Sequence, residues 1–305
     1  MKQHRREPAY LHLYREGLLK PRAQQAMELL KDCRLCPRTC RVDRLSGEQG
    51  FCRTGARASV ASFHPHFGEE APLVGRGGSG TIFFSSCNLL CSFCQNYEIS
   101  HLREGEEVES QRLAAMMLHL MQRGCENINF VTPSHVAPQI LQALCVAAGQ
   151  GLDIPLIYNS GGYDSADTIK ILDGIFDIYM PDFKFWDNAW GERFCRAPDY
   201  REQATAAIRE MHRQTGDLVM DRAGIAVRGL LVRHLVMPGG LAGTREIMTF
   251  LAKEISPDTY VNVMAQYRPC GDAAGDPLID RRVTHAEYTA AVREAVTAGI
   301  KRLDE

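Results

Sequence analysis

Short apolar runs alternate with longer amphipathic segments along most of the chain. Six apolar runs have the length and composition of buried strands, and they cover residues 81–84, 128–131, 154–158, 176–180, 230–236 and 260–265. Six segments repeat apolar residues at helical spacing, and they cover residues 113–123, 137–148, 166–172, 200–214, 246–255 and 284–297. Strands that alternate with helices predict a parallel sheet with right-handed crossovers. We therefore expect an α/β fold with a (β/α)6 unit, either a partial barrel or a doubly wound sheet, whose ligand sites lie at the carboxyl ends of the strands.

The residues that precede this unit follow a different pattern. Apolar positions over residues 8–31 recur at helical spacing, and Pro21 is expected to divide them into two helices. Residues 32–60 are rich in turns and cysteines, and residues 61–80 are expected to form a connecting loop. Residues 218–227 have the pattern of an inserted hairpin. We expect three parts: an N-terminal helical and Cys-rich metal-binding segment (1–60), the core (61–275) and a C-terminal helical extension (276–305).

The composition is that of an ordinary globular protein. Of the 305 residues, 45% are hydrophobic and 24% are charged, and the net charge is −2. There is no basic surplus of the kind that nucleic acid binding requires, and no acidic tail. The start, MKQHRREPAY, lacks the apolar core of a secretory signal, and no stretch approaches the roughly 18 apolar residues that span a bilayer. We expect a soluble, cytoplasmic protein with no nucleic acid or membrane partner.

Cysteine is used in an unusual way. The chain has 11 cysteines, and most of them fall between residues 33 and 94. Disulfides are a poor explanation in a protein without a signal peptide, because cytosolic thiols are kept reduced. An odd total also argues against a scheme in which every cysteine is paired. Tight clustering in a reducing compartment indicates metal binding.

The spacing C-x3-C-x2-C joins Cys87, Cys91 and Cys94, directly after the predicted strand 81–84. Three thiolates suit a [4Fe-4S] cluster with one iron left open, whereas ferredoxin-type clusters take a fourth cysteine. The alternative is a structural zinc site with Cys125 or a histidine as the fourth ligand. Zinc modules usually show two paired knuckles, and this trio stands alone.

The trio and its surroundings resemble a known family. C-x3-C-x-aromatic-C after the first strand is the signature of the radical SAM superfamily, and Phe93 is the aromatic residue here. Asn96, two positions after Cys94, resembles the ending of the motif in pyruvate formate-lyase-activating enzymes. A subgroup of proteins related to these activating enzymes is similar over most of the chain, including residues 33–40, 80–100, 179–184, 233–236 and 266–269.

The resemblance implies an oxidoreductase with a partial (β/α)6 barrel of the radical SAM type. A [4Fe-4S] cluster would bind S-adenosylmethionine (SAM) at its open iron and cleave it reductively to a 5′-deoxyadenosyl radical, which abstracts hydrogen from a substrate. The implied substrate is a protein, a glycyl radical enzyme activated under anaerobic conditions. The implied electron donor is reduced flavodoxin or ferredoxin.

Two other readings of the function stay open. The same chemistry could modify a small molecule or a peptide. The chain could also be a non-catalytic iron–sulfur electron carrier or a zinc-stabilised binding protein. An electron carrier gains nothing from an open iron, so the trio of cysteines favours an enzyme over the carrier.

The resemblance also implies where SAM would bind. Superfamily members often end their second strand with Gly-Gly-Glu, which contacts the methionine amine, whereas this chain has Thr132-Pro-Ser-His there. The hydroxyls of Thr132 and Ser134, or backbone carbonyls, could take over that contact. The other implied cofactor-binding residues lie beside the motif or near the ends of later strands, and they are Asn96, Asn159, Asp182, Lys184, Arg233 and Gln266. Each of them could instead form an ion pair or a cap at the mouth of the barrel.

No side chain is expected to act as an acid or base, because the cluster performs the chemistry. His135 and His234 are expected to be structural. Cys270, which follows the last predicted strand, is a candidate hydrogen donor or radical carrier.

The N-terminal cysteines form a second group. Cys33, Cys36, Cys40 and Cys52 have the spacing C-x2-C-x3-C-x11-C, with glycine and proline turns between them. Four thiolates could hold structural zinc, which we prefer, or a second Fe–S cluster. The alternative is four free thiols without metal. The remaining cysteines are expected to be packing residues, and they are Cys125, Cys145 and Cys195.

Overall fold

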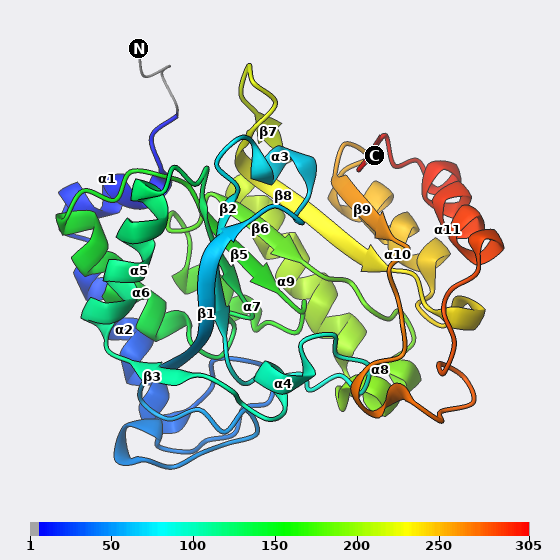
Figure 1. The fold of residues 1–305 in the computed structure, drawn as a ribbon, viewed down its shortest axis with the longest axis horizontal. Coiled ribbons are helices and arrows are strands. Elements are labelled where there is room, and N and C mark those ends of the chain that lie inside the picture. Colours follow the sequence, from blue (N-terminus) through cyan, green and yellow to red (C-terminus); the bar gives the residue numbers. More distant parts are fainter. Residues whose placement is uncertain (1–5, 305) are drawn as a thin grey trace.

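The computed structural model describes residues 6–304. Figure 1 shows a curved sheet whose outer face is covered by helices. Within the described residues the strands are β1 Ala58–His66, β2 Ser79–Phe84, β3 Glu106–Val108, β4 Ile128–Val131, β5 Leu156–Ser160, β6 Ile178–Pro181, β7 Val219–Met220, β8 Ala226–Leu235, β9 Tyr260–Met264 and β10 Arg302–Leu303.

The helices fill the connections between these strands. They are α1 Ala9–Arg15, α2 Leu19–Glu28, α3 Ala71–Val74, α4 Tyr97–Ser100, α5 Ser110–Gln122, α6 Ala137–Gly149, α7 Ala166–Ile171, α8 Asn188–Cys195, α9 Tyr200–Thr215, α10 Thr244–Phe250 and α11 His285–Ala298. Short 3₁₀ turns occur at η1 Leu29–Asp32, η2 Arg44–Ser46, η3 Pro238–Gly240 and η5 Gly271–Ala273, and α10 continues into a π-helical turn, η4 Leu251–Ile255.

The sheet contains the predicted parallel unit. Its strand order is β10-β9-β8-β6-β5-β4-β2-β1-β3, and β7 pairs with β8. The pairs from β2 through β4, β5, β6, β8 and β9 to β10 are all parallel, whereas β1 is antiparallel to both β2 and β3. The predicted α/β fold with six parallel strands and intervening helices is therefore confirmed. The sheet remains open, because β3 and β10 end it without pairing to each other.

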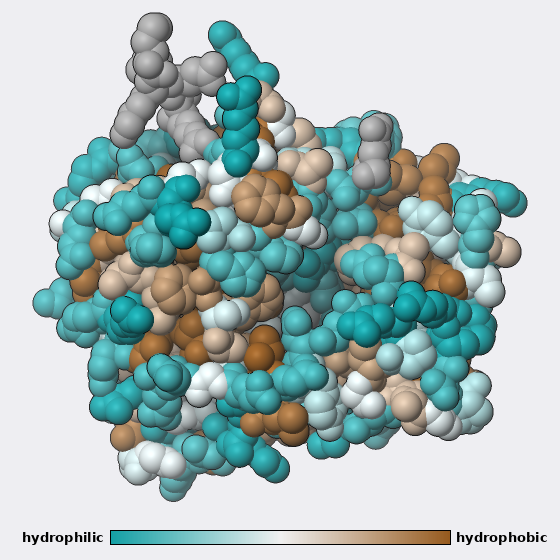
Figure 2. Space-filling view, in the orientation of Figure 1, coloured by the Kyte–Doolittle hydropathy of each residue, from teal (hydrophilic) through white to brown (hydrophobic). Residues whose placement is uncertain are grey.

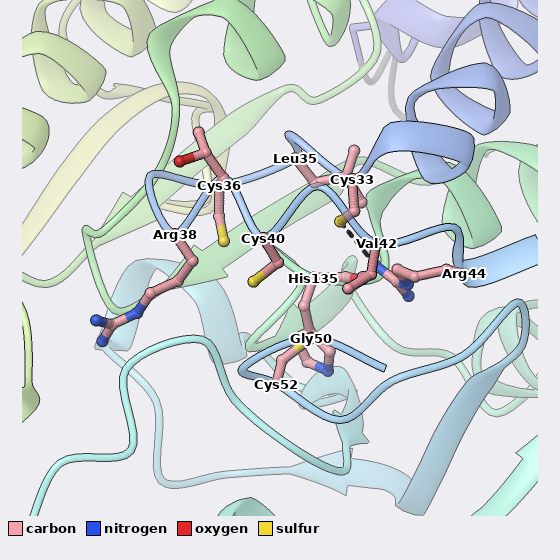
Figure 3. A pocket seen from close by; sticks show the side chains of 11 residues that line it. Cys33, Leu35, Cys36, Arg38, Cys40, Val42, Arg44, Gly50, Cys52 and His135 are labelled. Carbon is pink, nitrogen blue, oxygen red and sulfur yellow. Dashed lines mark hydrogen bonds between the residues drawn. The ribbon is translucent and has the colours of Figure 1, made fainter. Parts of the chain in front are cut away.

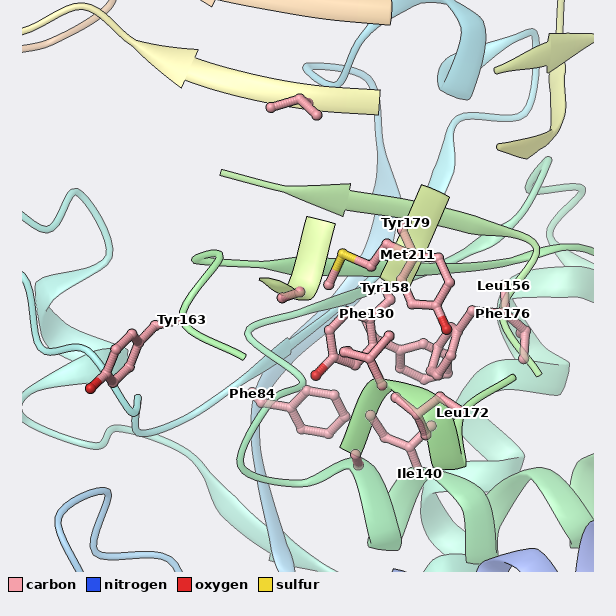
Figure 4. Close-up of a cluster of buried hydrophobic side chains, with 14 of the residues drawn as sticks. Phe84, Phe130, Ile140, Leu156, Tyr158, Tyr163, Leu172, Phe176, Tyr179 and Met211 are labelled. Atoms are coloured by element: carbon pink, nitrogen blue, oxygen red, sulfur yellow. The ribbon is translucent and has the colours of Figure 1, made fainter. Parts of the chain in front are cut away.

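The outer face of the sheet carries the main apolar core (Figure 4). In β4, Ile128 and Phe130 point toward the helices and are fully buried. The ring of Phe130 stacks on Phe84 of β2 at 6.2 Å and meets the edge of Phe176 at 6.0 Å. These contacts fix the distance between the strands and the helical layer, where α6 packs on both α2 and α5.

A smaller apolar cluster closes the inner face near the amino ends of the strands. Leu73 of α3 packs there against residues of the neighbouring strands, namely Ile157, Ile178, Met180, Leu231 and Tyr260. The side chain of Asn262 in β9 donates a hydrogen bond of 2.9 Å to Glu70, directly before α3. The α3 segment therefore closes the base of the partial barrel.

Residues 61–80 are not the connecting loop that the proline and glycine content predicted. They contain most of β1, the short helix α3 and the start of β2. Pro65 lies in the part of β1 that pairs only with β2, so its other side is a free edge where a missing amide hydrogen costs no ladder bond. The predicted boundary at residues 60 and 61 falls within β1, and β10 of the C-terminal part pairs with β9.

Other boundaries also differ from the prediction. The first two helices separate at Gly17, whose φ of 70° is left-handed, and not at Pro21. Pro21 lies in the first turn of α2, where the backbone amides have no helical partner to lose.

The helix α8 was not predicted, because its sequence NAWGERFC holds a central glycine and too short a periodic pattern. The predicted hairpin over residues 218–227 is confirmed by the antiparallel pair β7 and β8.

The face drawn in Figure 2 is mostly polar, with apolar side chains scattered over it, and it is hollowed near its centre. Among residues 6–304, no helix is both long and apolar enough to cross a bilayer.

His234 ties the parallel unit to α10. Its Nδ1 lies 2.9 Å from the carbonyl oxygen of Phe183 and its Nε2 lies 2.9 Å from the Thr244 hydroxyl. A neutral imidazole satisfies both contacts, because Nδ1–H donates and Nε2 accepts. Burial lowers the pKa of His234 from 6.5 to about 4, so the folded protein holds this ring neutral.

We expect the free energy of unfolding to fall as the pH drops from about 6.5 to 4. Between these pH values His234 is protonated in the unfolded chain but neutral in the folded protein. The free energy of unfolding therefore falls by up to about 1.4 kcal/mol for each pH unit. Urea unfolding at pH 7 and pH 5 measures the effect, and His234→Gln should remove that part of the pH dependence. The exposed His12 provides a control variant, His12→Gln. An unchanged pH dependence in His234→Gln would contradict the assignment.

Candidate functional site

The loop that carries C-x3-C-x2-C leaves β2 and reaches α4 without regular secondary structure. Ser86 and Leu90 adopt left-handed backbone conformations, with φ of 72° and 54°. Such conformations are costly for residues other than glycine and concentrate at functional sites. The loop is anchored by Phe93, whose buried ring makes edge contacts with Phe185 and Tyr267 at 5.9 and 6.0 Å.

The three thiols of the loop lie at one pocket. The backbone amide of Leu89 donates to Cys87 Sγ at 3.3 Å, and the Ser100 hydroxyl donates to Cys94 Sγ at 3.2 Å. Burial raises the pKa of Cys87 to about 12. A free thiol therefore stays protonated here, whereas a bound metal would remove the proton. Donors aimed at sulfur are the environment that thiolate ligands of a metal need.

The pocket has a volume of about 240 Å³ and lies at the carboxyl ends of the parallel strands. Polar side chains and the three cysteines line it together with apolar ones, among them Leu89, Phe93, Leu235 and Met264. Seven of the residues expected to bind cofactor border it: Asn96, Thr132, Asn159, Asp182, Lys184, Arg233 and Gln266. Residues from six separate strand ends or loops thus meet around one cavity.

A buried ion network forms one wall of the pocket. Asp182 accepts from Lys184 Nζ at 2.6 Å and from Arg233 Nε at 2.9 Å. Burial alone would raise the pKa of Asp182, but Arg233 and Lys184 outweigh it and hold that pKa below its ordinary value. Burial opposes the charge of Lys184, yet Asp182 raises the pKa of this lysine well above its ordinary value. Asp182 and both cations are therefore charged at neutral pH.

Arg233 connects this wall to the neighbouring strand. Its Nη2 donates to Asn159 Oδ1 at 2.7 Å, and its Nη1 lies 3.7 Å from a carboxylate oxygen of Glu69. Glu69 was not among the predicted site residues, because it belongs to the segment that the glycine and proline content assigned to a loop. No local sequence signal links Glu69 to Arg233, which lies more than 150 positions later in the chain.

The end of β4 differs from a regular strand end. Thr132 has a left-handed backbone, with φ of 60°, and its amide donates to the Asn159 carbonyl at 2.9 Å. Thr132 borders the pocket, at the place where we expected a substitute for Gly-Gly-Glu. Ser134, expected to share that role, is buried away from the pocket and hydrogen-bonds the Asp164 carboxyl instead.

Cys270 does not border the pocket. The loop that follows it packs on the outside of the cysteine loop, where the amide of Asp272 donates to the Ser92 carbonyl at 2.8 Å. Cys270 thus lies near the cysteine loop without bordering the pocket, and its role as a hydrogen donor or radical carrier stays a prediction.

Cys195 packs in the main apolar core with its side chain fully buried, as expected. In addition, its Sγ lies 3.3 Å from Cys91 Sγ, a contact that the sequence interpretation did not include. All 11 cysteines are free, so the two sulfurs are not bonded. Its only signal in the sequence was the high cysteine count, since the helix α8 that carries it was not predicted.

The four N-terminal cysteines line a separate pocket, together with the buried side chains of Arg44 and His135 (Figure 3). Their sulfurs have donors nearby: the amide of Phe51 lies 3.3 Å from Cys40 Sγ, and Arg44 Nη1 lies 3.9 Å from Cys33 Sγ. Gly50 lies so close to Cys40 that a Cβ would come within 2.7 Å of its sulfur.

Arg38 links this cysteine-rich segment to the C-x3-C-x2-C loop. Its Nε donates to the carbonyl oxygen of Asn88 at 2.8 Å, and its Nη2 donates to the Cys195 carbonyl at 3.0 Å. Its guanidinium also lies over the Phe51 ring, 3.8 Å from the centroid. One cation therefore holds three separate segments together.

Within residues 6–304, no three histidine, cysteine or acidic side chains are arranged to hold a single metal ion. A cubane cluster needs a different arrangement, because each cysteine binds a different iron. The N-terminal thiols would have to turn toward one another to share one ion.

Replacing Asp182 with asparagine should destabilise the protein by about 3–5 kcal/mol, because Lys184 and Arg233 would remain buried without their counter-ion. Chemical denaturation measures the loss. Asp167→Asn is the control, since Asp167 pairs with Lys170 on the exposed surface and its loss should leave the stability unchanged. An Asp182→Asn variant as stable as the parent protein would contradict the assignment of this network.

No protein-family model matches the chain. Two solved structures are similar to part of the chain. HydG, a maturase of the [FeFe]-hydrogenase, is 12% identical with a TM-score of 0.48, and the match covers 72% of this chain and 49% of HydG. Methylornithine synthase (PylB) is 13% identical with a TM-score of 0.44, and the match covers 73% of this chain and 63% of that enzyme.

A much closer relative comes from the curated proteins. Uncharacterized protein MJ0674 of Methanocaldococcus jannaschii is 32% identical over 293 residues, and the match covers 93% of this chain and 80% of the relative. The chain belongs to the same protein family as MJ0674.

Proposed function

We propose that this protein is a radical SAM enzyme that binds a [4Fe-4S] cluster on Cys87, Cys91 and Cys94. The observation that carries the proposal is the meeting of these three thiols with the charged network of Asp182, Lys184 and Arg233 at one pocket. A cavity of about 240 Å³ leaves room for a ligand beside the sulfurs.

The residues present fit such a cluster. Each of the three sulfurs has a hydrogen-bond donor within 3.3 Å, which suits thiolate ligands. The neighbouring Cys195 thiol and burial raise the pKa of Cys91, and burial raises the pKa of Cys94, whereas the charge of Lys184 acts in the opposite direction on both. When bound, the cluster and SAM would supply the reductive cleavage that yields a 5′-deoxyadenosyl radical.

The polar residues of the pocket would position SAM. Lys184 uses one of its three N–H groups on Asp182, so others remain for a carboxylate such as that of the methionine moiety. Asn159 and Asp182 can accept from ribose hydroxyls, and the hydroxyl of Thr132, which borders the pocket, can accept from the methionine amine. Asn96 and Gln266, which border the same pocket, would contact the adenosine.

The apolar part of the lining would keep water out. Leu89, Phe93, Leu235 and Met264 border the same cavity as the charged wall. Excluding water strengthens every ionic contact inside and protects a reactive radical from side reactions. No side chain is assigned as an acid or base.

We propose an activating-type reaction, in which the hydrogen comes from a glycine of a partner protein and reduced flavodoxin or ferredoxin supplies the electron. This part rests on the resemblance of the motif alone. A small-molecule or peptide substrate is the second candidate, and transfer of deuterium from labelled protein or labelled metabolites into 5′-deoxyadenosine distinguishes the two.

The N-terminal cysteines are proposed to bind a structural metal, zinc in preference to a second cluster. Supporting this are four thiols around one pocket, a buried arginine beside them and a glycine that lets Cys40 come close. Burial raises the pKa of Cys36 to about 12, so without a metal Cys36 would be a neutral thiol, and a bound ion would make it a thiolate.

Replacing Cys91 with alanine should abolish both the [4Fe-4S] signal and the release of 5′-deoxyadenosine from SAM. The readouts are anaerobic iron and sulfide analysis, electron paramagnetic resonance (EPR) of the reduced protein, and chromatography of the SAM products. Cys145→Ala, on the outer helix α6, is the control and should behave like the parent protein. A parent protein that holds the cluster but releases no 5′-deoxyadenosine would favour the electron carrier, and a cluster that survives Cys91→Ala would contradict the ligand assignment.

The double variant Cys33→Ala/Cys36→Ala should lower the zinc content if the N-terminal site holds zinc. If the site holds a second Fe–S cluster, the variant should instead lose the iron that exceeds the content of one cluster. Anaerobic elemental analysis measures both metals per chain. The matched control is Cys125→Ala/Cys145→Ala, which also removes two thiols but leaves the N-terminal pocket intact. Equal metal content in the two double variants would overturn the N-terminal site.

A further inference from the structure

Cys195 is the fourth thiol near the three proposed cluster ligands. It ends α8 with its side chain fully buried, and its Sγ lies 3.3 Å from the Sγ of Cys91. A packing role alone does not require sulfur at this position, since any small apolar side chain would fill the space. The sulfur–sulfur contact therefore calls for a chemical reason.

The position of Cys195 does not suit a ligand. Cys87, Cys91 and Cys94 all border the pocket, whereas Cys195 does not. It contacts the Cys91 sulfur at 3.3 Å without bordering the pocket. We therefore treat Cys195 as a residue that would act on the metal centre through the sulfur of Cys91.

The backbone holds Cys195 firmly in this place. Arg38 donates to the Cys195 carbonyl at 3.0 Å, and it also donates to Asn88 within the cysteine loop. On the other side, the amide of Ser92 donates to the Phe194 carbonyl at 2.8 Å. The loop and the end of α8 are therefore joined on both sides of the sulfur pair, so the thiol cannot easily turn away.

We propose that the Cys195 thiol donates an S–H hydrogen bond to the Cys91 sulfur and thereby raises the reduction potential of the cluster. A metal-bound Cys91 is a thiolate with no proton to give, and two negative sulfurs at this distance would repel each other. The hydrogen bond therefore runs from the Cys195 thiol to the Cys91 sulfur, which is the direction that the geometry gives. Reduction adds negative charge to the cluster and its ligands, so a donor to a ligand sulfur favours the reduced state. This inference rests on the proposed function.

The other two ligands show the same arrangement. Cys87 receives the backbone amide of Leu89, and Cys94 receives the hydroxyl of Ser100. With Cys195 as donor to Cys91, each of the three sulfurs has its own hydrogen bond. Cys195 is in this sense a positioning residue that acts on the cluster through Cys91.

The test compares Cys195→Ala, which removes the donor, with Cys195→Ser, which keeps one. The control is Cys125→Ala, another buried cysteine that precedes β4 and so lies at the opposite end of the sheet. Each protein is reconstituted anaerobically, analysed for iron and sulfide, and titrated electrochemically without SAM while the reduced cluster is followed by EPR.

We expect all of these proteins to hold the same amount of iron. At the midpoint potential of the parent protein, Cys195→Ala should be roughly two- to tenfold less reduced, which is the effect of one hydrogen bond; a tenfold change corresponds to 59 mV for one electron. The midpoint potential of Cys195→Ser should lie closer to that of the parent protein, and the midpoint potential of Cys125→Ala should be unchanged.

Two results would overturn the inference while leaving the proposed function intact. The first is an unchanged midpoint potential in Cys195→Ala with a full cluster. The second is a loss of iron in both Cys195 variants but not in Cys125→Ala, which would make Cys195 a ligand or a structural residue. A parent protein that binds no cluster at all would instead overturn the proposed function.

Discussion

Parallel pairing of β4, β5, β6 and β8 is the constraint on which the site depends. The ladder places Val131 beside Asn159, Asn159 beside Met180 and Asp182 beside Arg233. Because all these strands run the same way, the residues at their carboxyl ends meet at one edge of the sheet. A shift of one residue in any pair would turn the polar side chain into the helical layer and bring an apolar one into the pocket.

The charged wall also depends on this register. Asp182 can compensate both Lys184 and Arg233 only because β6 and β8 are neighbours. Its pKa stays low although it is buried, and the two cations stay charged for the same reason. A polar site of this kind is stable inside the protein because the apolar layers on the outer face and at the base surround it.

Sequence patterns were sufficient for the parallel strands, because periodicity and strand order imply which segments end at the same edge of the sheet. The resemblance to the radical SAM superfamily supplied the candidate cofactor-binding residues, most of which border one cavity, and their role stays a prediction. The patterns failed where contacts between distant segments decide the structure. Pro65 lies in a strand because only one neighbour pairs with it there, and the loop that follows Cys270 packs on Ser92. Neither partner is visible from the local sequence.

Arg38 illustrates the same difficulty on a larger scale. It comes from the cysteine-rich segment, yet it donates hydrogen bonds to the carbonyl oxygens of Asn88 and Cys195, which lie 50 and 157 positions later in the chain. Composition and spacing assigned its neighbourhood to metal binding alone. The structure adds a mechanical role, since the same segment holds the loop that carries the C-x3-C-x2-C motif.

The closed base of the partial barrel limits the routes by which ligands can reach the pocket. Leu73 and its buried apolar neighbours fill the end of the sheet opposite the pocket. We therefore expect ligands to enter and leave through the end of the partial barrel where the strands have their carboxyl ends and where the pocket lies.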